Sequence, residues 1–195
     1  LRELAAEVAN LEDQGKHDEA IGKLRAKFEM TSEENLIEKV TIGIMIGDTL
    51  ESRFDDVGAH REFLSAKNRS DCLECRGEKA SEEIVLVSNV HCRIASCLYA
   101  QGKFTKSLSF FQKAKSLLSR ATFETEDQKK VRVASLENNI AACIAAELPA
   151  IRCDEAVSKM ESSLKLLTAI LGSEHPRSNV VQYNLQKEKG KTVPE

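Results

Sequence analysis

Apolar residues return every three to four positions along most of the chain, which is the spacing of one face of an α-helix. Ala, Leu, Glu and Lys are abundant, and runs of β-branched residues are few. Only three of the 195 residues are proline. Pro149, Pro176 and Pro194 all fall where a helix would begin or has already ended. The pattern therefore predicts a chain made entirely of α-helices.

One arrangement of residues occurs several times along the chain. The segment QGKFTKSLSFFQKAKSLL, from residue 101, aligns with QGKHDEAIGKLRAKFEM, from residue 14. In each copy a small residue stands early in the second helix, and a larger apolar residue follows four positions later. The small residues are Ala20, Ala59, Ser107 and Ala156, and the larger residues are Leu24, Phe63, Phe111 and Met160.

The helix before each of the later turns also has a repeated pattern. In the segments IGDTL, IASCL and IAACI, a bulky residue is followed by a small one and by a second bulky residue three positions further on. The small residues are Gly47, Ala95 and Ala141. A small residue at this position lets the backbone of an antiparallel partner helix approach closely, and the bulky residues fill the seam between the two helices.

These features resemble the tetratricopeptide repeat, a helix–turn–helix of about 34 residues. The resemblance covers most of the chain, but the small residues of the second helices are 39, 48 and 49 positions apart, so longer helices or loops must absorb the extra length. It implies an all-α superhelical solenoid of about four antiparallel helix pairs and a C-terminal helix. We expect one domain over residues 1–195, excised from a longer protein, with repeats at about 1–34, 40–73, 88–121 and 133–171 and a last helix at 178–190.

The segment LLTAILGSEHPRSNVVQYNLQ, from residue 166, is similar to the kinesin-light-chain type of this repeat. The similarity lies in Leu171-Gly172, His175-Pro176 and Asn184-Leu185. Gly172 can also end a helix in the left-handed conformation, and Pro176 prevents the helix from continuing. We therefore interpret His175 as a loop residue and not as a catalytic base.

The resemblance implies a concave groove lined by fixed positions of the first helices, which would bind a peptide or a partner helix. Asparagine side chains suit such a groove because they offer both donors and acceptors to a peptide backbone. The expected function is a non-catalytic protein–protein interaction scaffold or adaptor. The alternative is a structural subunit or self-assembly segment of a cytoskeletal or multiprotein complex. The candidate protein-binding residues are Asp48, Glu51, Asn89, Arg93, Tyr99, Asn138, Tyr183 and Lys187.

Charge is distributed unevenly along the chain. Residues 1–58 carry 7 Lys and Arg against 14 Asp and Glu, whereas residues 101–195 carry 15 against 11. No region is strongly basic with interleaved aromatic residues, so we expect no nucleic-acid partner. No apolar run approaches the length needed to cross a bilayer, so we expect no membrane insertion. The six cysteines are interpreted as free thiols of a reducing compartment, which predicts a cytoplasmic location, with cytoskeletal association as a further option.

Residues that could carry chemistry are scattered. Cys72 and Cys75 have metal-ligand spacing, and His91 and Cys92 follow them. Zinc needs four ligands that converge, and there is no second Cys-x-x-Cys, so we interpret the pair as thiols at a helix end or in a loop. Neither a Ser/His/Asp arrangement nor a glycine-rich phosphate loop is visible. We therefore expect no enzyme activity, no cofactor and no resident metal.

Overall fold

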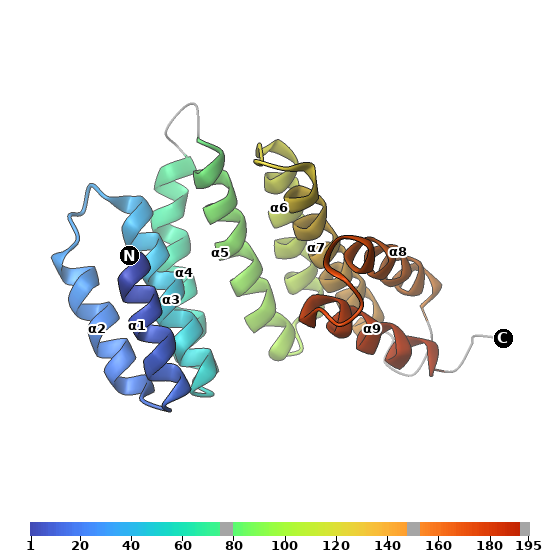
Figure 1. Ribbon diagram of the computed structural model, residues 1–195, viewed down its shortest axis with the longest axis horizontal. Coiled ribbons are helices and arrows are strands. Elements are labelled where there is room, and N and C mark those ends of the chain that lie inside the picture. The colour runs from blue at the N-terminus through green and yellow to red at the C-terminus, as the bar shows by residue number, and fades with distance from the viewer. Residues whose placement is uncertain (75–79, 148–152, 192–195) are drawn as a thin grey trace. The chain divides into compact units, whose positions relative to one another are not determined.

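The computed structural model describes residues 1–74, 80–147 and 153–191, and within these ranges the chain forms nine helices and no strands. Within each of the two units described below, consecutive helices run antiparallel (Figure 1). The prediction of an all-α chain is confirmed. The helices are α1 (Arg2–Asp13), α2 (His17–Met30), α3 (Leu36–Ser52), α4 (Asp56–Glu74), α5 (Ser81–Ala100), α6 (Phe104–Arg120), α7 (Glu126–Glu147), α8 (Asp154–Leu171) and α9 (Pro176–Lys189).

The chain divides into two compact units, residues 1–97 and residues 98–195, which we call the N-terminal unit and the C-terminal unit. The boundary lies within α5. In the N-terminal unit α1 packs on α2, α2 on α3 and α3 on α4. In the C-terminal unit α6 packs on α7, α7 on α8 and α8 on α9, while α7 also touches α9. In each unit, therefore, a helix packs mainly against the helices that precede and follow it in the chain.

The turns that follow α1, α3 and α5 have the same main-chain hydrogen bonds. The amide of the turn residue donates to the carbonyl three residues earlier, and the next amide donates to the carbonyl five residues earlier, at 2.8–2.9 Å in all three turns. The turn residue has a positive φ each time, 72° at Gly15, 64° at Phe54 and 71° at Gly102. Glycine adopts this conformation without strain, whereas the side chain of Phe54 makes it costly.

The small and large residues that repeat in the sequence are buried in the structure. The four small residues of the second helices are 0% exposed, and the four larger residues that follow them are at most 3% exposed. Gly47 on α3 explains why the position must be small, because a Cβ atom there would lie 2.2 Å from Cε1 of Phe63 on α4. The repeated pattern thus identifies the helix–helix seams.

In the C-terminal unit, the core joins α7, α8 and α9. Ala141 on α7, Met160 on α8 and Leu185 on α9 belong to the same buried cluster. Gly172 follows α8 with a φ of 92°, and Pro176 is the first residue of α9. His175 accepts a hydrogen bond at Nδ1 from the amide of Arg177 at 3.1 Å, so it caps α9, in agreement with its interpretation as a loop residue.

None of the described helices combines the length and the low polarity needed to cross a membrane.

Candidate protein-binding face

The residues that the sequence assigns to partner binding lie on α3, α5, α7 and α9, each the first helix of a pair or the C-terminal helix. We call the surface that these helices share within each unit the first-helix face. In the N-terminal unit this face is charged. Nη2 of Arg93 on α5 donates to Oδ2 of Asp48 on α3 at 2.8 Å. One turn further along the same helices, the Sγ of Cys97 donates to Oε1 of Glu51 at 3.4 Å. Three of the predicted residues therefore join α3 to α5.

The charge of Asp48 is poorly compensated. Burial, opposed by the charge of Arg93 and reinforced by Glu51 and Glu12, raises the pKa of Asp48 to about 6. Oδ1 of Asp48 is buried and, within the described part of the chain, has no hydrogen-bond partner. Burial and the neighbouring Glu51 also raise the pKa of the Cys97 thiol to about 12, so this thiol stays protonated and unreactive at neutral pH. The first-helix face of the N-terminal unit therefore has an excess of negative charge.

In the C-terminal unit the same face is held together by amides. Nδ2 of Asn184 on α9 donates to Oδ1 of Asn138 on α7 at 3.3 Å, and Nδ2 of Asn138 donates to Oδ1 of Asn139 at 3.3 Å. Asn138 is only 2% exposed. It therefore fixes α9 against α7, and a partner would reach it only through the side chains above it.

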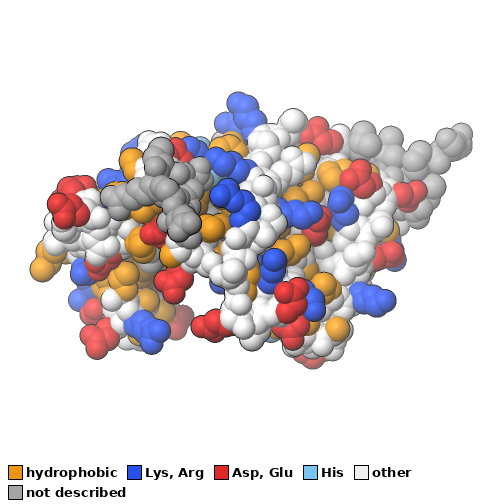
Figure 2. Space-filling model, turned by 90° about the horizontal axis from the view of Figure 1, so that it is seen from above, with side chains coloured by type: hydrophobic (Ala, Val, Ile, Leu, Met, Phe, Trp, Pro, Cys, Tyr) orange, Lys and Arg blue, Asp and Glu red, His pale blue; other side chains and the backbone are white. Residues whose placement is uncertain are grey.

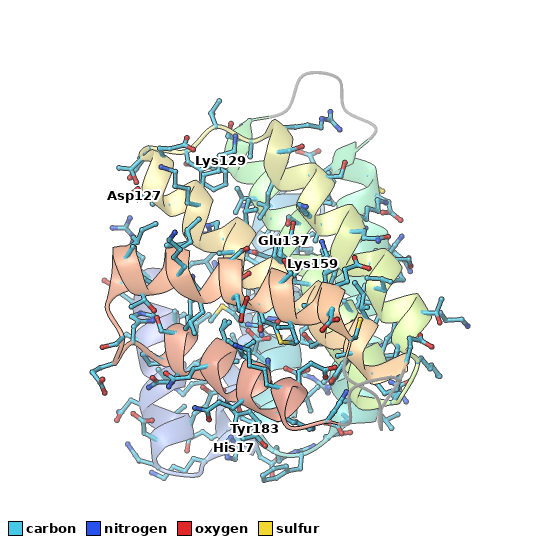
Figure 3. All side chains as sticks on the ribbon, turned by 90° about the vertical axis from the view of Figure 1, so that its right-hand side faces the viewer. His17, Asp127, Lys129, Glu137, Lys159 and Tyr183 are labelled. Atoms are coloured by element: carbon cyan, nitrogen blue, oxygen red, sulfur yellow. The ribbon has the colours of Figure 1, made fainter. Side chains whose placement is uncertain are left out.

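The exposed predicted residues of the C-terminal unit are aromatic or basic. Tyr99 is 38% exposed, and its ring packs edge-on against Phe104 with the centroids 5.2 Å apart. Burial, with Cys143 and Glu188 nearby, raises the pKa of Tyr99. Tyr183 is 66% exposed on α9, and Lys187, one turn further on, is also exposed. Figure 3 shows Tyr183 on α9, on the opposite side of α8 from Lys129.

The other candidates lie apart from these contacts. Asn89 is half-buried on α5. Cys72 is exposed on α4, and Cys75 lies outside the described residues. Within the described ranges, no three His, Cys, Asp or Glu side chains lie close enough to hold a metal ion.

Sequence reasoning missed a cavity on the side of α7 that faces the second helices. Lys115 of α6 is bonded to Glu137 of α7, and Nζ of Lys159 on α8 lies 3.6 Å from Oε2 of Glu137. Figure 3 shows Glu137 and Lys159 beside each other, with Lys129 and Asp127 nearer the start of α7. Burial works against ionisation of Glu137, but the two lysines outweigh it and lower its pKa.

A cavity of about 500 Å³ extends from these residues between α7 and α8. Ser163, on α8, lines it and is only 3% exposed. Ala156, Met160, Ser163 and Leu167 occupy one buried stripe at helical spacing, so a serine among apolar residues was the available sequence signal.

Comparison with solved structures identifies the architecture. A Podosopora anserina protein described as a kinesin light chain with nearly identical TPR-like repeats superposes with a TM-score of 0.67 at 14% identity, over 96% of this chain and 84% of that one. A variant of that protein gives a TM-score of 0.68 at 13% identity, with the same coverage. BtubC (BKLC) from P. vanneervenii gives 0.71 at 14% identity, over 96% of this chain and 75% of that one.

The chain has a TPR-like repeat fold. The resemblance found in the sequence is thereby confirmed, as is the helical-repeat solenoid class. No protein-family model and no curated protein matches the chain.

Proposed function

We propose that the chain is a non-catalytic adaptor that binds a peptide or a helix of a partner protein on the first-helix face. The observation that carries the proposal is the exposure of Tyr99 and Tyr183, 38% and 66%, on the C-terminal part of this face. A tyrosine offers a large apolar surface and a polar tip, and such side chains are enriched at protein interfaces. In the same unit, the hydrogen bond between the side-chain amides of Asn184 and Asn138 ties α9, which carries Tyr183, to α7.

The charges of the face suggest what each unit would prefer in a partner. In the N-terminal unit, a Lys or Arg side chain of the partner would relieve the repulsion that Asp48 experiences from Glu51 and Glu12. In the C-terminal unit, Lys187 would attract a carboxylate. The N-terminal unit would therefore favour a basic group of the partner and the C-terminal unit an acidic one, in addition to the apolar contact made by the tyrosines.

Site-specific photo-crosslinking in cells tests this proposal on the intact protein. A photoreactive phenylalanine analogue is placed at Tyr183 and, as a matched control, at Ala169, which is exposed on the second helix α8. We expect a discrete crosslinked partner from Tyr183 and none from Ala169. The Lys187→Glu variant should weaken the Tyr183 crosslink, because it reverses a charge one turn away. Equal crosslinking from both positions, or none from Tyr183, would argue against the first-helix face.

A second candidate function is self-assembly within a larger structure. It is favoured by Phe54 and Val57, which are 93% and 72% exposed around the turn between α3 and α4. Apolar side chains that lie exposed together often mark a contact with another protein. Light scattering over a range of concentrations tests this: assembly predicts a mass above that of the monomer, which Phe54→Ser and Val57→Ser together should reduce. A monomer at every concentration would exclude it.

A further inference from the structure

The cavity between α7 and α8 has the size and the lining of a ligand site. Its volume of about 500 Å³ lies within the usual range for sites that bind small groups. Val133 and Ala134 of α7 and Leu166 of α8 give it an apolar wall, and Lys129 and Lys130 line it at the N-terminal end of α7. It lies on the side of α7 that faces α6 and α8, so it is separate from the first-helix face.

Ser163 marks this cavity as more than a packing defect. Its hydroxyl is buried and has no hydrogen-bond partner among the residues that the structure describes. Hydroxyls in helices of this chain commonly bond back to the carbonyl four residues earlier, as those of Thr49 and Ser135 do at 2.9 Å. A buried hydroxyl that makes no such bond costs free energy until something else supplies a partner. Because Ser163 lines the cavity, a bound group can supply that partner.

The charges around the cavity favour an acidic ligand. Three lysines and two glutamates line it. Of these, Glu137 is bonded through Oε1 to Lys115. Its buried Oε2 makes no hydrogen bond within the described residues, but lies 3.6 Å from Nζ of Lys159. Lys130 has a long contact of 3.9 Å with Asp127, and Lys129 has no ion-pair partner in the part of the chain that is described. Glu126, one turn before Lys130, adds an opposing charge at the rim. A carboxylate therefore fits best near Lys129.

We propose that this α7–α8 cavity is a second docking site, which binds a short peptide segment of a partner protein with an apolar side chain next to an acidic one. The apolar side chain contacts Val133, Ala134 and Leu166, and its backbone carbonyl accepts a hydrogen bond from Ser163. The acidic side chain approaches Lys129. The site does not depend on the first-helix face, so either one can fail without the other.

Nuclear magnetic resonance titration of the ¹⁵N-labelled full chain tests the site with a defined probe, the end-blocked peptide Gly-Leu-Glu-Glu-Leu-Gly. We expect saturable shifts at the amides of Ser163 and Leu166. Replacing both glutamates of the probe by lysine, or both leucines by alanine, should weaken binding about tenfold, because each change removes one of the two contacts. Shifts confined to other helices, no saturation, or equal binding of the lysine probe would overturn the proposal.

Variants of the protein separate docking from folding. Lys129→Glu should weaken binding about tenfold, whereas Lys165→Glu, an equal charge change at an exposed position of α8 outside the cavity, should change it less than about twofold. If the two changes weakened binding equally, the probe would be attracted by lysine side chains in general and not by this cavity, and the proposal would be overturned.

Ser163→Ala should raise the melting temperature of the free protein, because it removes an unsatisfied buried hydroxyl, and yet weaken binding about threefold. The matched control is Ser178→Ala. Ser178 is also buried, but its hydroxyl donates to the carbonyl of Gly172 at 2.8 Å, so its loss should lower the melting temperature and leave binding unchanged. A structural role for Ser163 alone would give a lower melting temperature with unaltered binding, which would contradict the proposal.

Discussion

The N-terminal and C-terminal units solve the same packing problem with different side chains. At the seam, the N-terminal unit places Gly47 against the ring of Phe63, whereas the C-terminal unit places Ala141 and Met160 in one core cluster. On the first-helix face, a charged pair joins α3 to α5, whereas a pair of asparagines joins α7 to α9. In the turns before the second helices, the N-terminal unit uses Gly15 after α1 but Phe54 after α3, whereas the C-terminal unit uses Gly102 after α5.

In both units the repeat fixes the volumes of the seam residues and the pairing of the helices, and it leaves the chemistry of each position free. A smaller residue on one helix is matched by a larger one on its neighbour, because the interior must be filled to a nearly constant density. A polar side chain between first helices is acceptable once it has a partner, whether the partner is an ion or an amide. The stability contributed by the charged pair between α3 and α5 depends on pH. That of the asparagine pair between α7 and α9 does not, because amides do not titrate.

The largest expected effect concerns the seam of the N-terminal unit. Gly47→Ala should destabilise the protein by about 3 kcal/mol, because the new methyl group would overlap the buried ring of Phe63. The measurement is the free energy of unfolding from denaturant titration. Gly22→Ala is the matched control: Gly22 is exposed in α2 and nothing lies within 4 Å of its added methyl group, so this change should stabilise the helix by about 1 kcal/mol. If Gly47→Ala left the free energy of unfolding unchanged, α3 and α4 could move apart to accommodate the methyl group, which would contradict the prediction.

The next prediction concerns pH and the charged pair. The native pKa of Asp48, about 6, lies above its ordinary value of 3.8, so the folded state holds this proton more tightly than the unfolded chain. The resulting stability is complete below pH 3.8 and is lost as the pH rises through 6. Asp48→Asn removes the titration but keeps an oxygen for Arg93. Relative to the wild type, the variant should gain about 1 kcal/mol on going from acidic to neutral pH, after allowance for solvent screening.

Glu33 provides the control of opposite sign for this pH prediction. Its hydrogen bond with Lys39 lowers its pKa below the ordinary value of 4.5. The stability contributed by Glu33 is therefore present above pH 4.5 and is lost as the pH falls. Glu33→Gln should lose stability relative to the wild type on going from acidic to neutral pH, whereas Asp48→Asn gains it. Unfolding curves at several pH values measure both, and the same sign for the two variants would contradict the assignment.

The smallest effect concerns the turn. Phe54→Gly should stabilise the protein by somewhat under 1 kcal/mol, because glycine adopts the positive φ without strain but makes the unfolded chain more flexible. Phe54→Ala separates the backbone effect from the loss of the exposed ring, since alanine keeps the Cβ atom and should be nearly neutral. The measurement is the thermal unfolding midpoint of each variant, which should be highest for Phe54→Gly. Equal midpoints for glycine and alanine would show that the turn is not strained.

The helix class and the seams could be predicted from the sequence because they depend on periodicity. A residue that recurs with the helical period must face the same neighbour in every pair, so Ala59 and Phe63 were recognisable as seam residues before any coordinates. The cap formed by Gly172 and Pro176 was equally local, since each residue restricts its own backbone. The division into repeats and the choice of partner-binding residues remain predictions.

The details of the candidate sites could not be predicted because they depend on contacts between distant helices. Asn138 has the right phase for a surface position, but its burial follows from the approach of Asn184, 46 residues later. The raised pKa of Asp48 arises from burial and from the acidic residues Glu51 on α3 and Glu12 on α1, and it is opposed by Arg93 on α5. The cavity beside Ser163 is lined by residues of both α7 and α8, so it is a property of their packing and not of either helix alone.

The repeated turn has one more consequence. Its hydrogen bonds run from main-chain amides to main-chain carbonyls, so any side chain that tolerates the bend can occupy the corner. Most residues of a helical hairpin can thus be substituted while its backbone geometry is retained. That freedom explains how the architecture stays recognisable by superposition at 13–14% identity, where matching of residues alone no longer detects it.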